Sequence, residues 1–492
     1  MLYTELIKER YQLIVGYVGT IIIGIGFALL LPLLLLPVYS QEANETAYFI
    51  IPSLIAICLG YVMRRKLKCV KEVTLTLQEG GVIVLLAWIS ATIFCAMPFI
   101  ISGKLNFTQA VFEAVSGLTT TGLSVVDVTK TSHIFLMWRS IMQFIGGAGL
   151  AVIMLSAIIG PHGLGLYNAE ARSDKLLPNV AKSTKLIMII YTGYILSGII
   201  LYILAGMPWF DAINHSIAAV STGGFSTRAE SIGAYNSLSI ELITLILMIL
   251  GTINFAAHYV LLKGQIKKFF QIGEIRFMFF LLAFIVPLVA FFSLTRLYGS
   301  ISQGIRVAIF ELTSALSTTG FSTVGYTNWN GFAIFMMIVV MLIGGGAGST
   351  AGGIKQYRVY VMLKSLVWNI KSYLLPKNSV RQDYVVRPDG KFYVSSEHKI
   401  ETSNFITLYI LTYIIGISIL LIHGYSLQDA MFEIASSLGT VGLSVGVTSA
   451  DAPSMVLWTE SFGMMLGRLE FFVVFFASMK IIKDIKFMIK RR

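Results

Sequence analysis

Charged residues are scarce in this sequence. Only 13% of its 492 residues are Asp, Glu, Lys or Arg, whereas 56% are hydrophobic. This balance lies outside the usage of soluble globular domains and indicates a polytopic membrane protein. The formal net charge of +12 does not indicate nucleic-acid binding, because the basic residues separate apolar segments instead of gathering on one soluble face.

The sequence also lacks the residue patterns of disulfide, metal and catalytic sites. Its three cysteines, Cys58, Cys69 and Cys95, show no metal-ligand spacing, and an odd number does not suit a disulfide framework. The histidines are scattered along the chain, and nothing resembles a nucleophile motif. We therefore expect a protein that is not an enzyme and carries no cofactor of its own.

Long apolar runs, in contrast, are abundant. A helix needs ~20 apolar residues to cross a bilayer. The first run is longer than the ~7–15-residue core of a signal peptide, so we interpret it as a retained helix. We expect ten crossings, at about 13–38, 48–63, 81–102, 134–160, 185–206, 238–262, 275–295, 332–362, 403–423 and 454–482.

The basic residues predict how these crossings are oriented. Cytoplasmic loops of membrane proteins carry an excess of Lys and Arg. If the N-terminus is cytoplasmic, 30 of the 37 basic residues fall in cytoplasmic segments. We therefore predict a multi-pass membrane protein with both termini in the cytoplasm.

A short pattern recurs at four places between paired apolar runs. Alanine, threonine and glycine keep identical offsets, and a hydrophobic residue and then a serine follow each final glycine. The final glycines are 102, 96 and 122 residues apart, which indicates a long-period internal repeat. The ungapped stretches are AVFEAVSGLTTTG at 110–122, AINHSIAAVSTGG at 212–224, AIFELTSALSTTG at 308–320 and AMFEIASSLGTVG at 430–442.

Each recurring stretch is too short to cross the membrane. Even as a helix it would cover only about 18 Å, against the ~30 Å of the hydrocarbon core. Each stretch must dip in and return, and non-helical backbone at that depth has to be enclosed by protein or line a watery cavity. We predict an all-α polytopic membrane protein with an N-terminal helix pair and four pseudo-symmetric repeats of helix, re-entrant helix, loop and helix around a central pore. The expected divisions are 1–72 for the pair and 73–170, 171–268, 269–400 and 401–492 for the repeats.

The loops of the four repeats can supply the oxygens that a bare alkali cation needs. Backbone carbonyls replace its hydration shell without adding net charge, and glycine allows the positive φ that turns carbonyls toward an axis. Packing of small residues between membrane helices is the alternative, but it gives no reason for recurrence at one fixed depth. We predict cation binding at four candidate filter segments. They are Thr119, Thr120, Thr121 and Gly122; Ser221, Thr222, Gly223 and Gly224; Ser317, Thr318, Thr319 and Gly320; and Gly439, Thr440, Val441 and Gly442.

A carboxylate recurs within the short helices. Glu113, Glu311 and Glu433 occupy one repeat position, and His215 replaces them in the second repeat. These side chains either tune the electric field or anchor the short helices by hydrogen bonds. We favour anchoring.

Two features occur in one repeat each. A glycine-rich stretch, 344–353, interrupts an apolar run, and each glycine costs ~1 kcal/mol in a helix relative to alanine. We predict an irregular loop under the candidate filter segments that can obstruct conduction; close helix packing is the alternative. The gate residues of this loop are Gly344, Gly345, Gly346, Gly348, Gly352 and Gly353.

The second such feature is Arg468, which lies within the last apolar run. A membrane-buried arginine costs at least ~2.5 kcal/mol, so Arg468 should face the pore or pair with a carboxylate or with carbonyls of the glycine-rich loop. We interpret it as part of a gate, and a structural pair with Glu470 is the alternative. Arg139, at the start of another second helix, is expected at the membrane interface.

The only sizeable polar excursion covers about 371–402. Pro388, Asp389 and Gly390 stand between two short hydrophobic runs, a pattern that predicts a β-hairpin. Docking of a cytoplasmic partner and a solvated connector are both open interpretations.

Together these features resemble the Trk/Ktr/HKT superfamily of potassium transporters. The shared features are four helix, pore-helix, filter and helix units, a Thr-x-Gly filter, a glycine-rich break in the third unit and an arginine in the fourth. The N-terminal helix pair is most similar to the bacterial TrkH branch, and the resemblance covers essentially the whole chain. Gly223 and Val441 depart from the threonine that the other two segments have at that position.

This resemblance implies a location in the bacterial inner (plasma) membrane, a function and partners. The filter glycines mark potassium preference in that family, so it implies potassium uptake at the four segments and gate roles for the glycine-rich loop and Arg468. It also implies a homodimer with one pore in each subunit. Control would come from a cytoplasmic nucleotide-binding ring of the TrkA/KtrA type, and any nucleotide would bind to that partner.

The alternative function is an ion-coupled secondary transporter for sodium, another small cation or a solute. Such folds often carry inverted repeats and broken helices at mid-membrane. The repeats here run parallel, since each starts inside and dips from outside. That geometry favours a cation pore.

Overall fold

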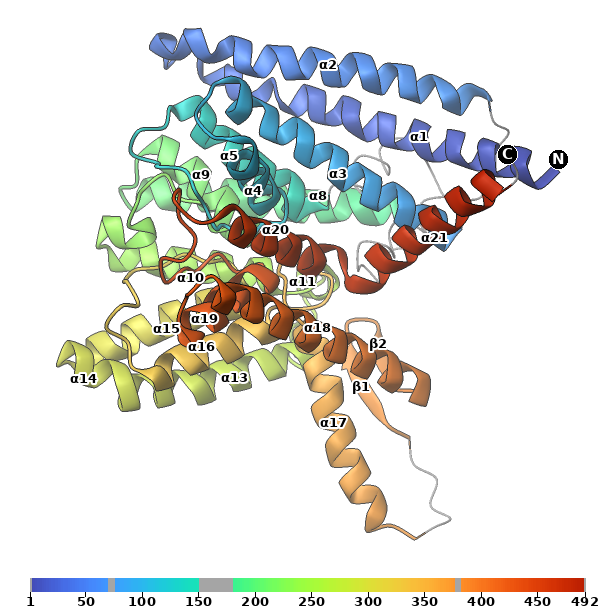
Figure 1. Cartoon of the computed structure of the whole chain (residues 1–492). Coiled ribbons are helices and arrows are strands. Elements are labelled where there is room, and N and C mark those ends of the chain that lie inside the picture. Colours follow the sequence, from blue (N-terminus) through green and yellow to red (C-terminus); the bar gives the residue numbers. More distant parts are fainter. Residues whose placement is uncertain (1, 70–75, 150–179, 377–381, 491–492) are drawn as a thin grey trace.

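The computed structural model describes residues 2–69, 76–149, 180–376 and 382–490, and most of them are helical. An antiparallel helix pair opens the chain, as predicted: α1 (Leu2–Ala28) packs along α2 (Thr46–Arg64). Short 3-10 turns at Leu31–Leu35, Ser40–Glu45 and Arg65–Cys69 connect and end the pair. The pair lies on the outside of the bundle, against α3 (Leu77–Ile101) (Figure 1).

The rest of the chain forms four units, each with a first helix, a re-entrant helix and a second helix. Helix α3 is the first helix of the first unit. The first helices of the other three units are α8 (Val180–Leu204), α13 (Gly273–Val289), which continues through a π-turn (Ala290–Leu294) into α14 (Thr295–Tyr298), and α18 (Ser396–Ile422). The re-entrant helices are α4 (Phe107–Leu118), α9 (Trp209–Val220), α15 (Ile301–Ser317) and α19 (Leu427–Leu438). The second helices are α5 (His133–Ala148), α10 (Leu238–Thr252) with α11 (Phe255–Leu262), α16 (Gly331–Ile343) with α17 (Gln356–Tyr373), and α20 (Ser454–Leu469) with α21 (Phe471–Lys490). Two shorter helical pieces are the 3-10 turn Ser231–Tyr235 and α12 (Ile266–Phe269).

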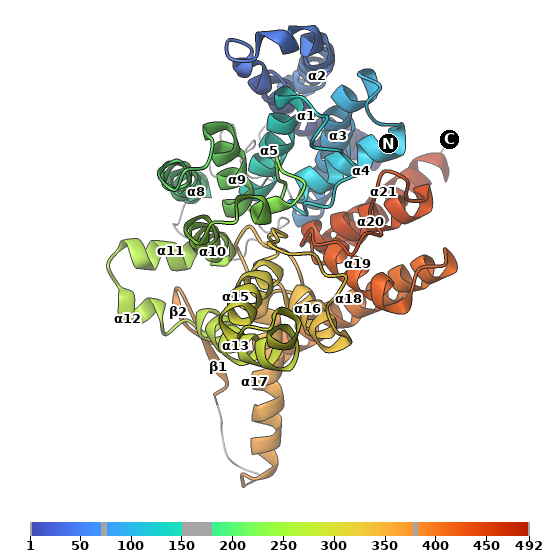
Figure 2. The same cartoon turned by 90° about the vertical axis from the view of Figure 1, so that its left-hand side faces the viewer.

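Helix contacts close these units into a ring. Each re-entrant helix packs between the second helix of its own repeat and that of the preceding repeat: α4 between α5 and α20, α9 between α10 and α5, α15 between α16 and α10, and α19 between α20 and α16. Figure 2 looks along the axis of this ring, with the repeats arranged around it in chain order. The fold therefore brings the ends of all four re-entrant helices to one central place.

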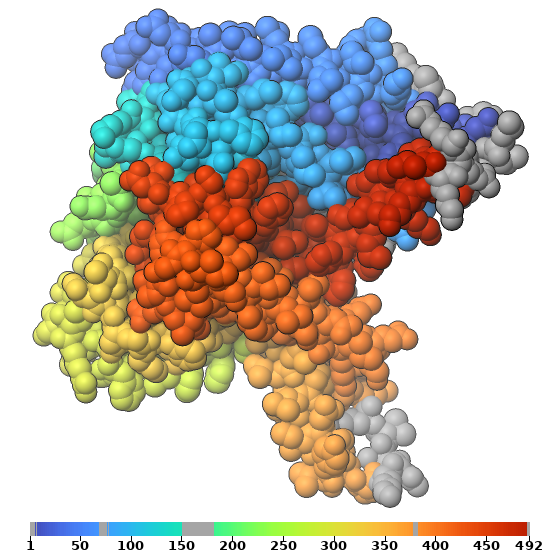
Figure 3. Space-filling view, in the orientation of Figure 1, coloured from blue at the N-terminus to red at the C-terminus, as the bar shows by residue number. Residues whose placement is uncertain are grey.

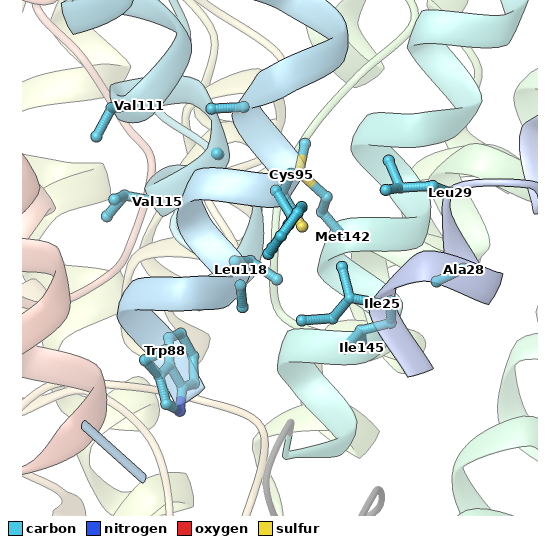
Figure 4. Close-up of a cluster of buried hydrophobic side chains, with 14 of the residues drawn as sticks. Ile25, Ala28, Leu29, Trp88, Cys95, Val111, Val115, Leu118, Met142 and Ile145 are labelled. Atoms are coloured by element: carbon cyan, nitrogen blue, oxygen red, sulfur yellow. The ribbon is translucent and has the colours of Figure 1, made fainter. Parts of the chain in front are cut away.

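Local chemistry explains where the re-entrant helices begin. Asn106, Ser300 and Ser426 precede three of them, and each side-chain oxygen accepts a hydrogen bond from the backbone N–H three residues later. Such caps satisfy donors that a helix start leaves unpaired. In the first repeat, apolar side chains from α1, α3, α4 and α5 then fill one buried cluster, with Met142 and Ile145 beside Cys95 and Leu118 (Figure 4).

The second helices of repeats two, three and four are not continuous, and only the break at the glycine-rich stretch was predicted. Among the described residues, six helices are long and apolar enough to cross a membrane, or seven if α10 and α11, bent by 107°, count as one span. The α16 helix stops before the glycine-rich loop, and α20 stops at Glu470, whose φ is +63°. The expected run 134–160 begins as α5 and extends past residue 149, outside the described part. Broken second helices thus recur in the repeats.

The predicted β-hairpin is confirmed. Strands β1 (Tyr384–Arg387) and β2 (Gly390–Tyr393) pair antiparallel, with Arg387 opposite Gly390 across a two-residue turn. Helix α17 projects sideways from the bundle beside this hairpin, and the space-filling view shows it as an arm (Figures 1 and 3). The predicted excursion therefore begins within α17 and ends within α18.

The two ends of the described chain meet on one side of the molecule. The start of α1 and the end of α21 lie at the same end of the bundle (Figure 1), and the Tyr11 hydroxyl is 3.1 Å from a carboxylate oxygen of Asp484. Of the predicted divisions, 72/73 and 170/171 lie outside the described residues, and 400/401 falls inside α18.

Candidate functional site

The four re-entrant helices end in one unusual backbone conformation. The threonine that follows each last turn has φ between 51° and 56°, a left-handed region that β-branched residues rarely adopt. Two residues later, the final glycine of each segment has φ between 71° and 97°. The sequence repeat is therefore also a conformational repeat. The threonines are Thr120, Thr222, Thr318 and Thr440, and the glycines are Gly122, Gly224, Gly320 and Gly442.

The same glycines close the four segments into a ring. A Cβ atom added to any of them would overlap a carbonyl oxygen of the next segment, and this relation runs from repeat one through repeat four and back to repeat one. Only glycine allows so close an approach between backbones. The contacts are Gly122 with the Gly223 oxygen, Gly224 with the Thr319 oxygen, Gly320 with the Val441 oxygen and Gly442 with the Thr121 oxygen. The structure thus brings together all four predicted segments.

The repeated carboxylates anchor the chain that leaves each segment, as we favoured. Glu113 accepts hydrogen bonds from the Ser124 hydroxyl, at 3.0 Å, and from the Val125 N–H, at 3.1 Å. Glu311 receives the Thr323 N–H at 2.8 Å, and Glu433 receives the Ser444 hydroxyl at 2.6 Å. These carboxylates are buried, so their hydrogen bonds offset the cost of removing them from water. In the second repeat the His215 ring plays this part, with Nε2 3.0 Å from the Ser226 hydroxyl.

The expectation that Arg139 lies at the membrane interface is wrong. Its side chain is 3% exposed and forms an ion pair with Glu113, with Nε 2.7 Å from the carboxylate. It also donates to the Ser226 carbonyl, at 3.2 Å, and lies over the Phe225 ring. A buried guanidinium needs such partners. Arg139 therefore joins the first repeat to the second just beyond the ring.

The glycine-rich stretch is an irregular loop, as predicted, and it touches three of the candidate filter segments. The Gly352 N–H donates to the Thr318 hydroxyl at 2.8 Å, and the hydroxyls of Thr222 and Thr350 are 3.1 Å apart. A Cβ atom on Gly352 would overlap the Thr440 hydroxyl. The loop therefore lies directly against the left-handed threonines of repeats two, three and four.

Arg468 makes contact with this loop. Its guanidinium donates to the Thr350 carbonyl oxygen and, at 2.6 Å, to the carbonyl oxygen of Gly146 at the end of α5. Glu470, the alternative partner, instead forms an ion pair with Arg358, 2.7 Å apart. Arg468 thus fixes the loop of the third repeat to the end of α5 in the first. The structure brings all the predicted gate residues together.

Sequence reasoning missed several residues that hold the loop. The Lys355 ammonium donates to the Ala351 carbonyl oxygen. Glu274 receives the Ala347 N–H at 2.7 Å, and the buried Gln356 donates to the Gly344 carbonyl at 3.0 Å. A signal was present, because polar residues within or beside apolar membrane runs mark functional sites by default.

The ring offers oxygens without net charge. None of the candidate filter residues carries a charged side chain, so the ligands available to an ion are carbonyl and hydroxyl oxygens. Among the residues that the structure describes, the buried hydroxyls of Thr120 and Thr440 have no hydrogen-bond partner. Such a site suits a cation that gives up its water to neutral oxygens.

Comparison with protein families agrees with this geometry. The family model described as TrkH, cation transport protein, matches residues 46–487. The chain belongs to the TrkH family. Members of the TrkH family are transporters and not enzymes, so both the resemblance and the expected non-enzymatic role are confirmed. With its apolar spans, the chain is an integral protein of the plasma membrane.

Individual relatives support the assignment to the TrkH family. The chain is 32% identical to the Trk system potassium uptake protein TrkH of Halomonas elongata, over 81% of this chain and 84% of that one. It is 30% identical to a cation transporter of Methanocaldococcus jannaschii, over 97% and 99%. The crystal structure of the potassium transporter TrkH from Vibrio parahaemolyticus matches with a TM-score of 0.81 at 25% identity, over 94% of this chain and 98% of that one. The all-α repeat architecture is thereby confirmed.

Proposed function

We propose that this protein carries potassium into the cell through the ring of four candidate filter segments. The observation that carries the proposal is the closed ring itself, in which each final glycine lies against a carbonyl of the next repeat. The names of relatives, Trk system potassium uptake proteins, support potassium as the substrate.

Electrostatics favours a cation at this place. The re-entrant helices all end at the ring, and the C-terminal end of a helix carries a partial negative charge. The hydroxyls of Thr120 and Thr440, which have no hydrogen-bond partner in the described part of the chain, add two oxygens to the carbonyls of the ring. Potassium then binds by exchanging hydration water for fixed oxygens of low net charge.

The gate in this proposal is the glycine-rich loop held by Arg468. The loop forms hydrogen bonds with the filter segments of repeats two and three and lies against Thr440 of repeat four. It therefore blocks the path of the ion beyond the ring. The arginine adds a positive charge beside that path. Opening requires the Arg468 contacts with Thr350 and Gly146 to be broken.

Partners complete the proposed system. Relatives are named as members of a Trk system, which supports a regulatory subunit, and we propose a cytoplasmic nucleotide-binding ring of the TrkA/KtrA type. The hairpin and both termini then lie on the cytoplasmic side. We further propose a homodimer, because the projecting arm α17 exposes large apolar side chains such as Leu363, Leu366 and Ile370.

Ion flux into liposomes tests the proposed function. Purified protein should carry potassium down its gradient and prefer it to sodium, as measured by reversal potentials in opposed gradients of the two ions. Flux should be the same with and without a proton gradient. Sodium flux equal to potassium flux would overturn the filter assignment, and strict dependence on a proton or sodium gradient would favour the coupled transporter instead.

A further inference from the structure

The repeats can be superposed through one contact that three of them share. In each of these repeats, a glycine of the second helix packs against the last residue of the re-entrant helix, which lies four residues before the final filter glycine. A Cβ atom added to the second-helix glycine would crowd the carbonyl oxygen of that residue. This contact fixes which positions of the second helices are equivalent. The pairs are Gly146 with Leu118, Gly251 with Val220 and Gly467 with Leu438.

One helical turn before this glycine, the fourth repeat lacks a side chain that the first two repeats have. The buried Met142 of the first repeat lies close to Gly117 of α4, and the buried Leu247 of the second repeat lies close to Gly198 of α8. The fourth repeat has Gly463 instead. One turn earlier still, the fully buried Trp138 of the first repeat is matched by the much smaller Thr459. Figure 4 shows how Met142 fills the space in the first repeat.

This loss of side-chain volume leaves a groove between α18, α19 and α20. Its volume is about 360 Å³, and Gly416, Gly463 and Leu438 are among its lining residues. The hydroxyls in its wall are already used within their own helices: Thr412 donates to Leu408, at 3.0 Å, and Thr459 to Met455, at 2.8 Å. A groove whose polar groups are already satisfied does not hold water well.

The groove opens toward the bilayer. Helix α18 is one of the six apolar spans, and the rim residues Ile415, Met455 and Phe462 are 61%, 53% and 62% exposed. We propose that a phospholipid acyl chain inserts into this groove in the fourth repeat and replaces the side chains that Met142 and Trp138 supply in the first. An apolar wall at bilayer depth is complementary to a hydrocarbon chain and to no polar ligand.

The inserted chain reaches the back of the re-entrant helix. Ile434, Ser437 and Leu438 form that wall, and they are at most 3% exposed. Leu438 directly precedes the filter segment of this repeat, and its carbonyl lies against Gly467, next to Arg468. The lipid therefore supports the filter and gate of the fourth repeat from behind.

Photo-crosslinking with lipid tests this site. The protein is reconstituted in nanodiscs of a phosphatidylcholine that carries a diazirine in the middle of one acyl chain, irradiated, and mapped by peptide mass spectrometry. We expect carbene adducts on the three α19 residues that line the groove, Ile434, Ser437 and Leu438. Gly463→Leu should abolish these adducts, while adducts on the exposed Phe280 of α13 persist. Leucine is accommodated there, because the nearest atom to its Cβ, the Ser437 hydroxyl, is 3.5 Å away.

Matched variants keep the test decisive. Gly193→Leu places the same side chain at an exposed glycine of α8, where nothing lies within 4 Å of an added Cβ, and it should leave the α19 adducts unchanged. Thr459→Trp provides a second way to fill the groove if Gly463→Leu unfolds in a melting assay. Adducts confined to the rim, no adducts in the groove because a second copy covers it, or α19 adducts that survive filling would each overturn the proposal.

Discussion

At the residue scale, the left-handed threonines carry both the symmetry and the asymmetry of the site. All four hold a conformation that costs ~1–3 kcal/mol, so the surrounding packing must enforce it. Their hydroxyls differ, however: those of Thr222 and Thr318 bond to the glycine-rich loop, whereas Thr120 and Thr440 have no partner within the described residues. The four threonines therefore share one backbone conformation but differ in their contacts with the glycine-rich loop.

Arg468→Ala should raise the basal potassium flux. The substitution removes two hydrogen bonds from a charged donor, each worth about 1.5–3 kcal/mol, that link Thr350 of the loop to Gly146 of α5. We expect an increase of at least about tenfold in liposomes, since 1.4 kcal/mol corresponds to a factor of ten. Arg468→Lys keeps the positive charge but loses the several N–H donors of the guanidinium. Its basal potassium flux should lie between that of the unchanged protein and that of Arg468→Ala. Unaltered flux in the alanine variant would remove Arg468 from the gate.

Glu113→Ala should destabilise the fold strongly. It would leave the Arg139 guanidinium, 3% exposed, without its carboxylate, and breaking a buried pair in this way costs about 3–5 kcal/mol. Unfolding in detergent measures the loss. The double variant Glu113→Ala with Arg139→Met should recover part of it, because no buried charge remains. A double variant as unstable as the sum of both single changes would contradict this account of the pair.

At the element scale, the repeats could be predicted and the helix breaks largely could not. The spacing of Ala, Thr and Gly in one register predicted four re-entrant helices, and the structure confirms them. The break in the second helix of the third repeat could be predicted, because the stretch 344–353 is rich in glycine. The breaks at Asn254 and Glu470 carry no comparable composition, since a single cap or one left-handed residue is enough. Arg139 was misplaced because its partner, Glu113, is distant in sequence.

The close contact between the glycine-rich loop and the filter segment of repeat four leads to a second prediction about the gate. Gly352→Ala would place a methyl group on the Thr440 hydroxyl and beside the Gly439 carbonyl, so it should displace the loop and increase basal flux severalfold. Gly325→Ala is the matched control, because nothing lies within 4 Å of its added Cβ. The idea fails if the two alanine variants conduct alike in the liposome assay.

At the scale of the whole molecule, four unequal repeats share one ring. The N-terminal pair packs mainly on α3 of the first repeat and also meets Asp484 of α21 through Tyr11. Helix α21 returns to pack on α3, and the arm α17 leaves the third repeat (Figures 1 and 2). The sequence composition and its apolar runs predicted a polytopic membrane protein and its N-terminal helix pair. The direction of the arm α17 depends on tertiary packing, which no local sequence pattern indicates. The outer elements differ, yet the inner glycines keep identical contacts.

Because each final glycine of the ring contacts a carbonyl of the next repeat, a change at one glycine should affect the ion selectivity of the whole ring. A serine side chain at Gly122 would overlap the Gly223 carbonyl and push the first segment from the second, which disturbs oxygens on both. We expect the potassium-to-sodium permeability ratio to fall on the order of tenfold, equivalent to ~1.4 kcal/mol of discrimination. Gly325→Ser, remote from such contacts, serves as the control.

The most direct measurement is therefore the reversal potential of Gly122→Ser protein in liposomes with opposed potassium and sodium gradients. The account predicts a shift toward the sodium equilibrium potential, with the Gly325→Ser protein unchanged from the original. An identical reversal potential in all three proteins would contradict the claim that this ring selects the ion.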